Sequence, residues 1–219
     1  IALKHVGFGT VNGADGKPFK TRDGGVMNLE DLIALSKDKV RSSLPEPNEV
    51  EGFGEKEIEK MVSQIAMAAI KFQDLKNNTA SGYIFELDDF AKFEGKTGPY
   101  IQYAIARINS ILRKAETAPG NVVITNREER DLALKIAQLC SVINRAEAEK
   151  EPSIISDYAY VLAQTFSSFY NASSIMNAES APIAASRLRL AKLVRDILTL
   201  LLYLLGIEAP EVMLKKANA

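Results

Sequence analysis

The sequence predicts a mainly α protein in which a helical bundle follows a short β and loop segment. Apolar residues recur at steps of three and four from Glu55 onward, the spacing of helices that each bury one face. Six of the thirteen glycines fall within the first 25 residues, where turn dipeptides such as Asn12-Gly13 separate short β-prone pieces. We therefore predict an initial β-hairpin that ends in a lysine-bearing loop, with five or six helices behind it.

The composition narrows the class of protein. Of the 219 residues, 47% are hydrophobic and 25% are charged, as in folded proteins, and the net charge of -1 gives no general basic field for nucleic acid. Any contact with RNA must therefore be local. One cysteine and one histidine cannot form an intrachain disulfide or a four-ligand zinc site, so we predict no bound metal and a reducing, cytoplasmic location. No apolar run approaches the ~20 residues that cross a bilayer, so no membrane span is predicted.

The first two helices are delimited by a cap and by prolines. Asn28 is a suitable N-cap for an amphipathic helix that the segment Pro45–Pro47 ends. A longer helix starts near Glu55 and carries one apolar stripe. The helical period breaks between residues 77 and 97, where residues 83–85 predict a short extended segment.

The later helices also have recognisable ends. Pro99 suits a first helical position, and Thr125 with Glu128 forms a predicted capping box. Gly206 is a suitable left-handed residue after the last helix. We predict these helices over residues 99–115, 125–146, 152–171 and from about 183 to 206.

Several common catalytic motifs are excluded by counting. Neither Gly16-Lys17 nor Gly95-Lys96-Thr97 has the earlier glycine that a phosphate-binding P-loop needs. A Ser-His-Asp or Cys-His arrangement would have to use His5, and no nucleophile elbow lies near it. A metal site inside the bundle would need Glu-x-x-His pairs, which one histidine cannot supply.

One basic segment is a candidate site. Lys17, Lys20 and Arg22 lie within six residues on a glycine-flanked loop, which could close cations over a polyphosphate and release it again. A solvated basic turn is the alternative interpretation of these residues alone.

Five blocks lie in order between His5 and Met213: HVGFGTVNGADGKPFKTRDGG, FEGKTGPYIQYAIARINSIL, FSSFYN, ASRLRLAKLVRDIL and LLGIEAPEVM. Together they resemble the arginyl-tRNA synthetase family. The end of that family's catalytic domain is similar to HVGFGTVNGADGKPFKTRDGG, in which KPFKTR stands for the lysine-rich class I signature. The helix that joins the catalytic and anticodon-binding domains is similar to FEGKTGPYIQYAIARINSIL. The anticodon-binding domain, named after a DALR sequence, resembles FSSFYN, ASRLRLAKLVRDIL and LLGIEAPEVM. Arg187–Leu190 stands where the literal Asp-Ala-Leu-Arg string would be.

The resemblance implies a domain organisation and a reaction. Residues 1–45 would end the catalytic domain, 46–97 would connect, and 98–219 would form the DALR anticodon-binding bundle. The family's other signature needs two histidines, so we expect the rest of the catalytic domain to lie upstream and this chain alone to be inactive. The implied enzyme is a monomeric ligase that uses ATP, with Mg²⁺, and arginine to form arginyl-adenylate, and then charges its tRNA.

The resemblance also assigns roles to residues. Lys20 is the implied catalytic lysine with Lys17 as its partner, and His5, Gly7 and Lys20 would bind ATP. For His5, a structural role in a strand remains open.

The predicted tRNA contacts lie in the helical part. Tyr170 and Met213 match family positions near the anticodon, and Gln102, Arg107 and Arg113 could face the tRNA backbone. Core packing is the preferred interpretation for Phe166 and Phe169, and for Tyr100 and Tyr103. A non-catalytic helical tRNA-binding module is the alternative function, although such a module has no use for the lysine loop.

Overall fold

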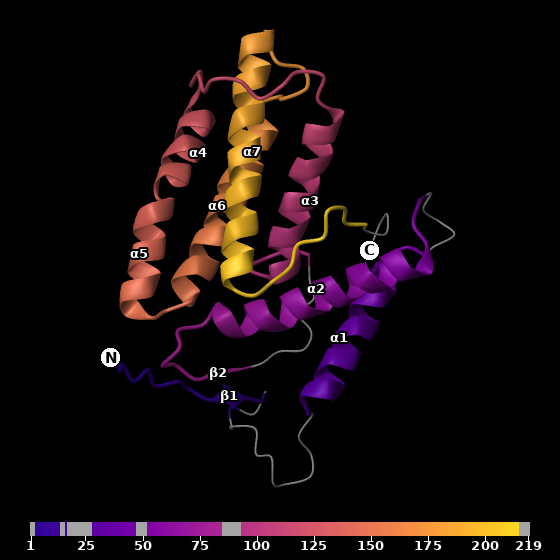
Figure 1. Ribbon diagram of the computed structural model, residues 1–219, viewed down its shortest axis with the longest axis vertical. Coiled ribbons are helices and arrows are strands. Elements are labelled where there is room, and N and C mark those ends of the chain that lie inside the picture. The colour runs from indigo at the N-terminus through magenta and orange to yellow at the C-terminus, as the bar shows by residue number, and fades with distance from the viewer. Residues whose placement is uncertain (1–2, 14–15, 17–27, 47–51, 85–92, 215–219) are drawn as a thin grey trace.

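The computed structural model describes residues 3–13, 16, 28–46, 52–84 and 93–214. It confirms a mainly α fold (Figure 1). The upright bundle contains α3 (Gly98–Lys114), α4 (Arg127–Ala137), α5 (Leu139–Glu149), α6 (Ser153–Ala172) and α7 (Ala181–Leu204). Below it, α2 (Glu55–Leu75) crosses the end of the bundle and packs against α1 (Leu29–Ser43).

The bundle is held together by one apolar cluster that all its long helices share. The cluster includes Ile101 and Ile108 of α3, Leu162 and Phe166 of α6, and Leu198 of α7, all of them buried. A second cluster, between α1 and α2, is built around Val40, Leu44, Ile58, Val62 and Ile65. The described residues therefore form two apolar cores, and α2 contributes to both, with Phe72 in the first and Ile65 in the second.

The predicted helix ends are largely confirmed. The Asn28 side chain accepts the Asp31 N–H at 2.8 Å and begins α1. At the end of α7, Gly206 has φ +66°, and the Ile207 N–H donates to the Leu202 carbonyl at 2.8 Å. This pair of features is a Schellman motif, which satisfies carbonyls that the helix end would leave open.

Two helical details differ from the prediction. The cap of α4 is one residue later, because the Asn126 side chain accepts the Glu129 N–H at 2.9 Å. The single helix predicted through Ala146 is divided at Gln138 into α4 and α5. At that point the Lys135 carbonyl accepts the Tyr158 hydroxyl at 2.8 Å, a contact from another helix that competes with the regular ladder.

The β element is not the predicted hairpin. β1 (Val11–Asn12) pairs in parallel with β2 (Tyr83–Ile84), which lies within the extended segment predicted for residues 83–85. Part of the predicted hairpin, including the lysine-bearing loop, lies outside the described residues. Among the described helices, none is long and apolar enough to cross a membrane.

Candidate functional site

Arg107 of α3 and Tyr170 of α6 contact each other at the surface of the bundle. The apolar residues of α3 face the core, and Arg107 is exposed at the edge of that apolar face. The Arg107 guanidinium carbon lies 4.2 Å from the centroid of the Tyr170 ring, within the range of a cation–π contact. Tyr170 is half-buried in the last turn of α6, and its ring lies 6.1 Å from that of Phe166. Aromatic packing and a stacked cation therefore fix the Tyr170 ring at the surface.

The aromatic residues around Tyr170 divide between core and surface. Phe166 and Phe169 are buried, as predicted. Tyr103, predicted to be core, is 36% exposed, and this prediction is wrong because Tyr103 is out of phase with the apolar stripe of α3. Tyr103 precedes Arg107 by one helical turn, so both belong to the same face of α3.

The predicted tRNA contact of Gln102 is corrected by its burial. Gln102 is fully buried, and its Nε2 donates to the Glu208 carbonyl at 2.6 Å and to the Gln64 carbonyl at 3.2 Å. Its Oε1 has no hydrogen-bond partner among the described residues. Gln102 therefore joins α3 to α2 and to the C-terminal segment, and its side chain is not available to RNA.

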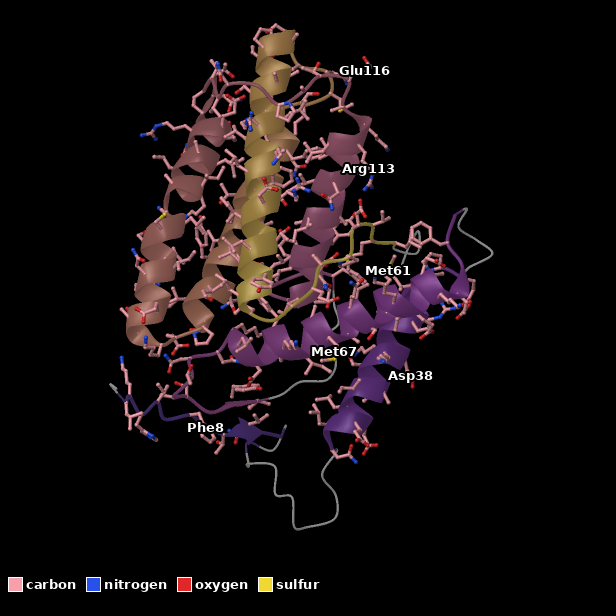
Figure 2. The ribbon with its side chains drawn as sticks, in the orientation of Figure 1. Phe8, Asp38, Met61, Met67, Arg113 and Glu116 are labelled. Atoms are coloured by element: carbon pink, nitrogen blue, oxygen red, sulfur yellow. The ribbon has the colours of Figure 1, made fainter. Side chains whose placement is uncertain are left out.

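Arg113 and Met213 have different surroundings. Arg113 is exposed in the last turn of α3, and Figure 2 shows it near the upper end of that helix. Met213 is partly buried against the apolar cluster of α1 and α2. Tyr170 packs against the bundle cluster instead, so the structure does not bring Met213 and Tyr170 into one apolar cluster.

A buried ion pair fixes the loop that follows Tyr170. Arg187 Nε donates to Glu129 Oε1 at 2.8 Å, and the two side chains are 4% and 0% exposed. Arg187 Nη1 also donates to the Ser174 carbonyl at 2.7 Å. Burial alone would raise the pKa of Glu129, but hydrogen bonds from Arg187 and Thr125 outweigh it and lower this pKa. This ion pair joins α4, α7 and the loop after α6, and no local sequence pattern indicated it.

The N-terminal candidates are only partly described. His5 and Gly7 are exposed, and a Cβ added to Gly7 would meet nothing within 4 Å. The close backbone approach that a glycine permits occurs at Gly9, where a Cβ would lie 2.2 Å from the Ser81 carbonyl carbon. Lys17 and Lys20 lie outside the described residues. No three His, Cys, Asp or Glu side chains gather as a metal site in the part of the chain that the structure describes.

Two family models match the chain. The model described as "DALR anticodon binding domain" matches residues 101–213, and the model described as "tRNA synthetases class I (R), catalytic domain" matches residues 1–87. The first range contains Arg107 and Tyr170. The second contains the candidate lysine loop.

Similar proteins point to the same family. Proteins named arginine–tRNA ligase from Maricaulis maris and Hyphomonas neptunium are 43% and 44% identical to this chain, which they cover to 96% and 95%. The chain spans 36% of the length of each. The structure of the Thermus thermophilus arginyl-tRNA synthetase has a TM-score of 0.79 at 28% identity, covering 94% of this chain and 35% of that one. The Plasmodium falciparum arginyl-tRNA synthetase has a TM-score of 0.76 at 26% identity, covering 95% of this chain and 35% of that one. The chain therefore belongs to the arginyl-tRNA synthetase family.

Proposed function

We propose that this chain is the C-terminal part of an arginine–tRNA ligase and that its bundle binds the anticodon of arginine tRNA. The observation that supports this role most directly is the contact between Arg107 and Tyr170. Unpaired bases are held by stacking on aromatic rings and guanidinium planes, and this contact presents both groups at one surface. Arg113, on the same helix, is the proposed contact for the RNA backbone.

The proposed reaction is completed by the lysine loop. Arginine attacks the α-phosphate of ATP, pyrophosphate leaves, and the arginyl group then passes to the terminal ribose of the tRNA. Negative charge grows on the departing pyrophosphate, so a lysine that closes on it late stabilises the transition state more than the bound substrates. We assign this role to Lys20, with Lys17 as its partner, and we expect ATP to arrive with Mg²⁺. His5 and Gly7 are proposed to lie beside the nucleotide.

The proposal also includes an organisation for the longer protein. Residues 1–45 end the catalytic domain, residues 46–97 connect, and residues 98–219 form the anticodon-binding domain. The rest of the catalytic domain would be supplied by residues upstream of this chain, which alone would be inactive. We propose that the whole protein acts as a cytoplasmic monomer. Met213 remains a proposed contact near the anticodon.

Tyr170→Ala in the full-length protein is expected to weaken the binding of arginine tRNA by about 1–3 kcal/mol, the usual contribution of one stacked base. The thermal melting temperature should change little, because Tyr170 lies at the edge of the core. Titration of labelled tRNA, together with a melt of the free protein, measures both quantities.

Two variants serve as controls for this experiment. Tyr170→Phe keeps the ring and should retain most of the affinity. Tyr203→Ala removes a tyrosine that is 76% exposed near the end of α7, and it should leave tRNA binding unchanged. A Tyr170→Ala protein that binds tRNA normally but melts early would show that Tyr170 has only a packing role.

A further inference from the structure

The turn between α5 and α6 makes a concentrated set of hydrogen bonds with the loop that follows α2. Glu151 Oε2 accepts the Asn78 side-chain amide at 2.9 Å and the Thr79 N–H at 3.0 Å. Glu151 Oε1 accepts the Thr79 hydroxyl at 3.2 Å and the Ser153 N–H at 3.3 Å. We call these hydrogen bonds the Glu151 junction. One carboxylate thus holds the tip of the loop against the first residue of α6.

The same loop holds the segment that leads to the lysine loop. The Gly9 N–H donates to the Thr79 carbonyl at 2.8 Å, and the Tyr83 N–H donates to the Thr10 carbonyl at 3.0 Å. Gly9 lies so close to the backbone of Ser81 that no side chain would fit there. The Thr79 carbonyl therefore bonds to Gly9 of the N-terminal segment, and the Thr79 N–H and hydroxyl bond to Glu151 of the bundle.

The start of this loop is held by packing, because Phe72 and Leu75 of α2 lie in or against the bundle cluster, whereas its tip is held by the hydrogen bonds of Glu151. A cavity of about 530 Å³ lies between the two sides, lined by Phe8 and Gly9 of the N-terminal segment and by Pro152 at the start of α6. Figure 2 shows Phe8 beside β1, below α2, and its side chain is 87% exposed. At this cavity the tip of the loop and the N-terminal segment are joined to the bundle by directed bonds, among them those of Glu151.

The junction lies at one end of α6, and Tyr170 lies at the other. A helix of 20 residues spans about 30 Å as a single rigid rod. Resting on the proposed function, we propose that Glu151 is a positioning residue that fixes Gly9 and Thr10, which precede the lysine loop in the sequence, relative to the anticodon-binding bundle. The connection runs from Tyr170 along α6 to Glu151, then through Thr79 to Gly9.

The chemistry of the junction suits a carboxylate specifically. The groups of Asn78, Thr79 and Ser153 that meet the Glu151 carboxylate are all donors, so an ionised carboxylate can accept all of these bonds. Burial alone would raise the pKa of Glu151, but hydrogen bonds from Thr79 and Ser153 outweigh it and lower this pKa. Glu151 is therefore ionised at neutral pH. A glutamine would turn its own N–H₂ group toward another donor.

The test is the kinetics of Glu151→Gln in the full-length protein. We expect kcat for arginylation, and the rate of ATP–pyrophosphate exchange, to fall by about 10- to 100-fold, as for a misplaced reacting group. The KM for tRNA and the melting temperature should stay close to those of the unaltered protein. Thr79→Val, which removes the hydroxyl but keeps the N–H, should have a smaller effect of the same kind. Glu149→Gln changes an exposed carboxylate two residues away, 3.9 Å from Arg145, and should have no effect.

Two outcomes would overturn the proposal. An unchanged kcat in Glu151→Gln would show that the Glu151 junction does not position the N-terminal segment for catalysis. A parallel loss of melting temperature and tRNA affinity would show that Glu151 only stabilises the fold. If the unaltered protein fails to arginylate tRNA, the proposed function itself is refuted, a result distinct from both.

Discussion

Arg187→Met is expected to destabilise the bundle by about 3–5 kcal/mol, because it leaves the buried carboxylate of Glu129 without its cation. Methionine is shorter than arginine but has a similar volume, so the loss reflects charge more than volume. Glu129 would still accept hydrogen bonds from Thr125, at 2.6 Å from the N–H and 2.9 Å from the hydroxyl. Native-state hydrogen exchange of amides in α4 and α7 of the full-length protein measures the loss locally.

The effect of Arg187→Met should depend on pH. In the unaltered protein the pKa of Glu129 is lower than in the unfolded chain. The ion pair therefore contributes its full stability above the pKa that Glu129 has in the unfolded chain. This contribution is lost as the pH falls through the pKa of Glu129 in the folded protein. Removing Arg187 removes the largest cause that lowers this pKa, so we expect the pKa of Glu129 to be higher in the variant and protonation to relieve part of the penalty. The difference between the two proteins should therefore shrink as the pH falls from neutral through the lowered pKa of Glu129.

Two further variants make the Arg187 result interpretable. Glu129→Gln combined with Arg187→Met should recover much of the lost stability, because no buried charge remains. Arg145→Met breaks only an exposed helical pair with Glu149 and should change stability by less than about 0.5 kcal/mol. Equal stabilities of Arg187→Met and the unaltered protein at neutral pH would contradict the argument.

Lys20→Ala in the full-length protein is expected to slow arginine activation by about 10²- to 10³-fold, the usual effect of removing one preorganised charge from a transition state. Arginine and tRNA should bind nearly as before, because the lysine acts mainly as the pyrophosphate leaves. Single-turnover adenylate formation, measured separately from transfer to tRNA, isolates the step.

The matched control for Lys20 is Lys60→Ala, which removes an exposed lysine of α2 and should not alter activation. Lys17→Ala should slow the same step less than Lys20→Ala. If transfer to tRNA collapsed while adenylate formation stayed normal, Lys20 would serve a different step from the one proposed.

Local signals predicted most of the fold, and tertiary contacts account for the differences. The caps at Asn28 and Gly206 were predictable because a cap depends on a few neighbouring residues. The division between α4 and α5 was not, since the Tyr158 hydroxyl reaches the Lys135 carbonyl from another helix. Parallel pairing of Val11 with Tyr83 likewise joins residues far apart in the sequence, which turn dipeptides cannot indicate.

The candidate site was predictable where residue type and helical phase agree. Arg107 and Tyr170 were named separately, but only the structure shows their contact. Gln102 was misassigned because its polar side chain suggested exposure, whereas it is bonded to the backbone of two other segments. Tyr103 lies one turn before Arg107 and outside the apolar stripe, and this helical phase indicated exposure. Its aromatic side chain suggested core packing instead.

The most direct test of the central claim is arginylation by the full-length protein of arginine tRNA and of the same tRNA with a substituted anticodon. We predict that arginine is esterified to the normal tRNA, and that the substitution lowers kcat/KM by at least about tenfold, as expected from losing a stacked and bonded base. Failure to esterify arginine, despite tight tRNA binding, would contradict this account and favour a non-catalytic tRNA-binding module.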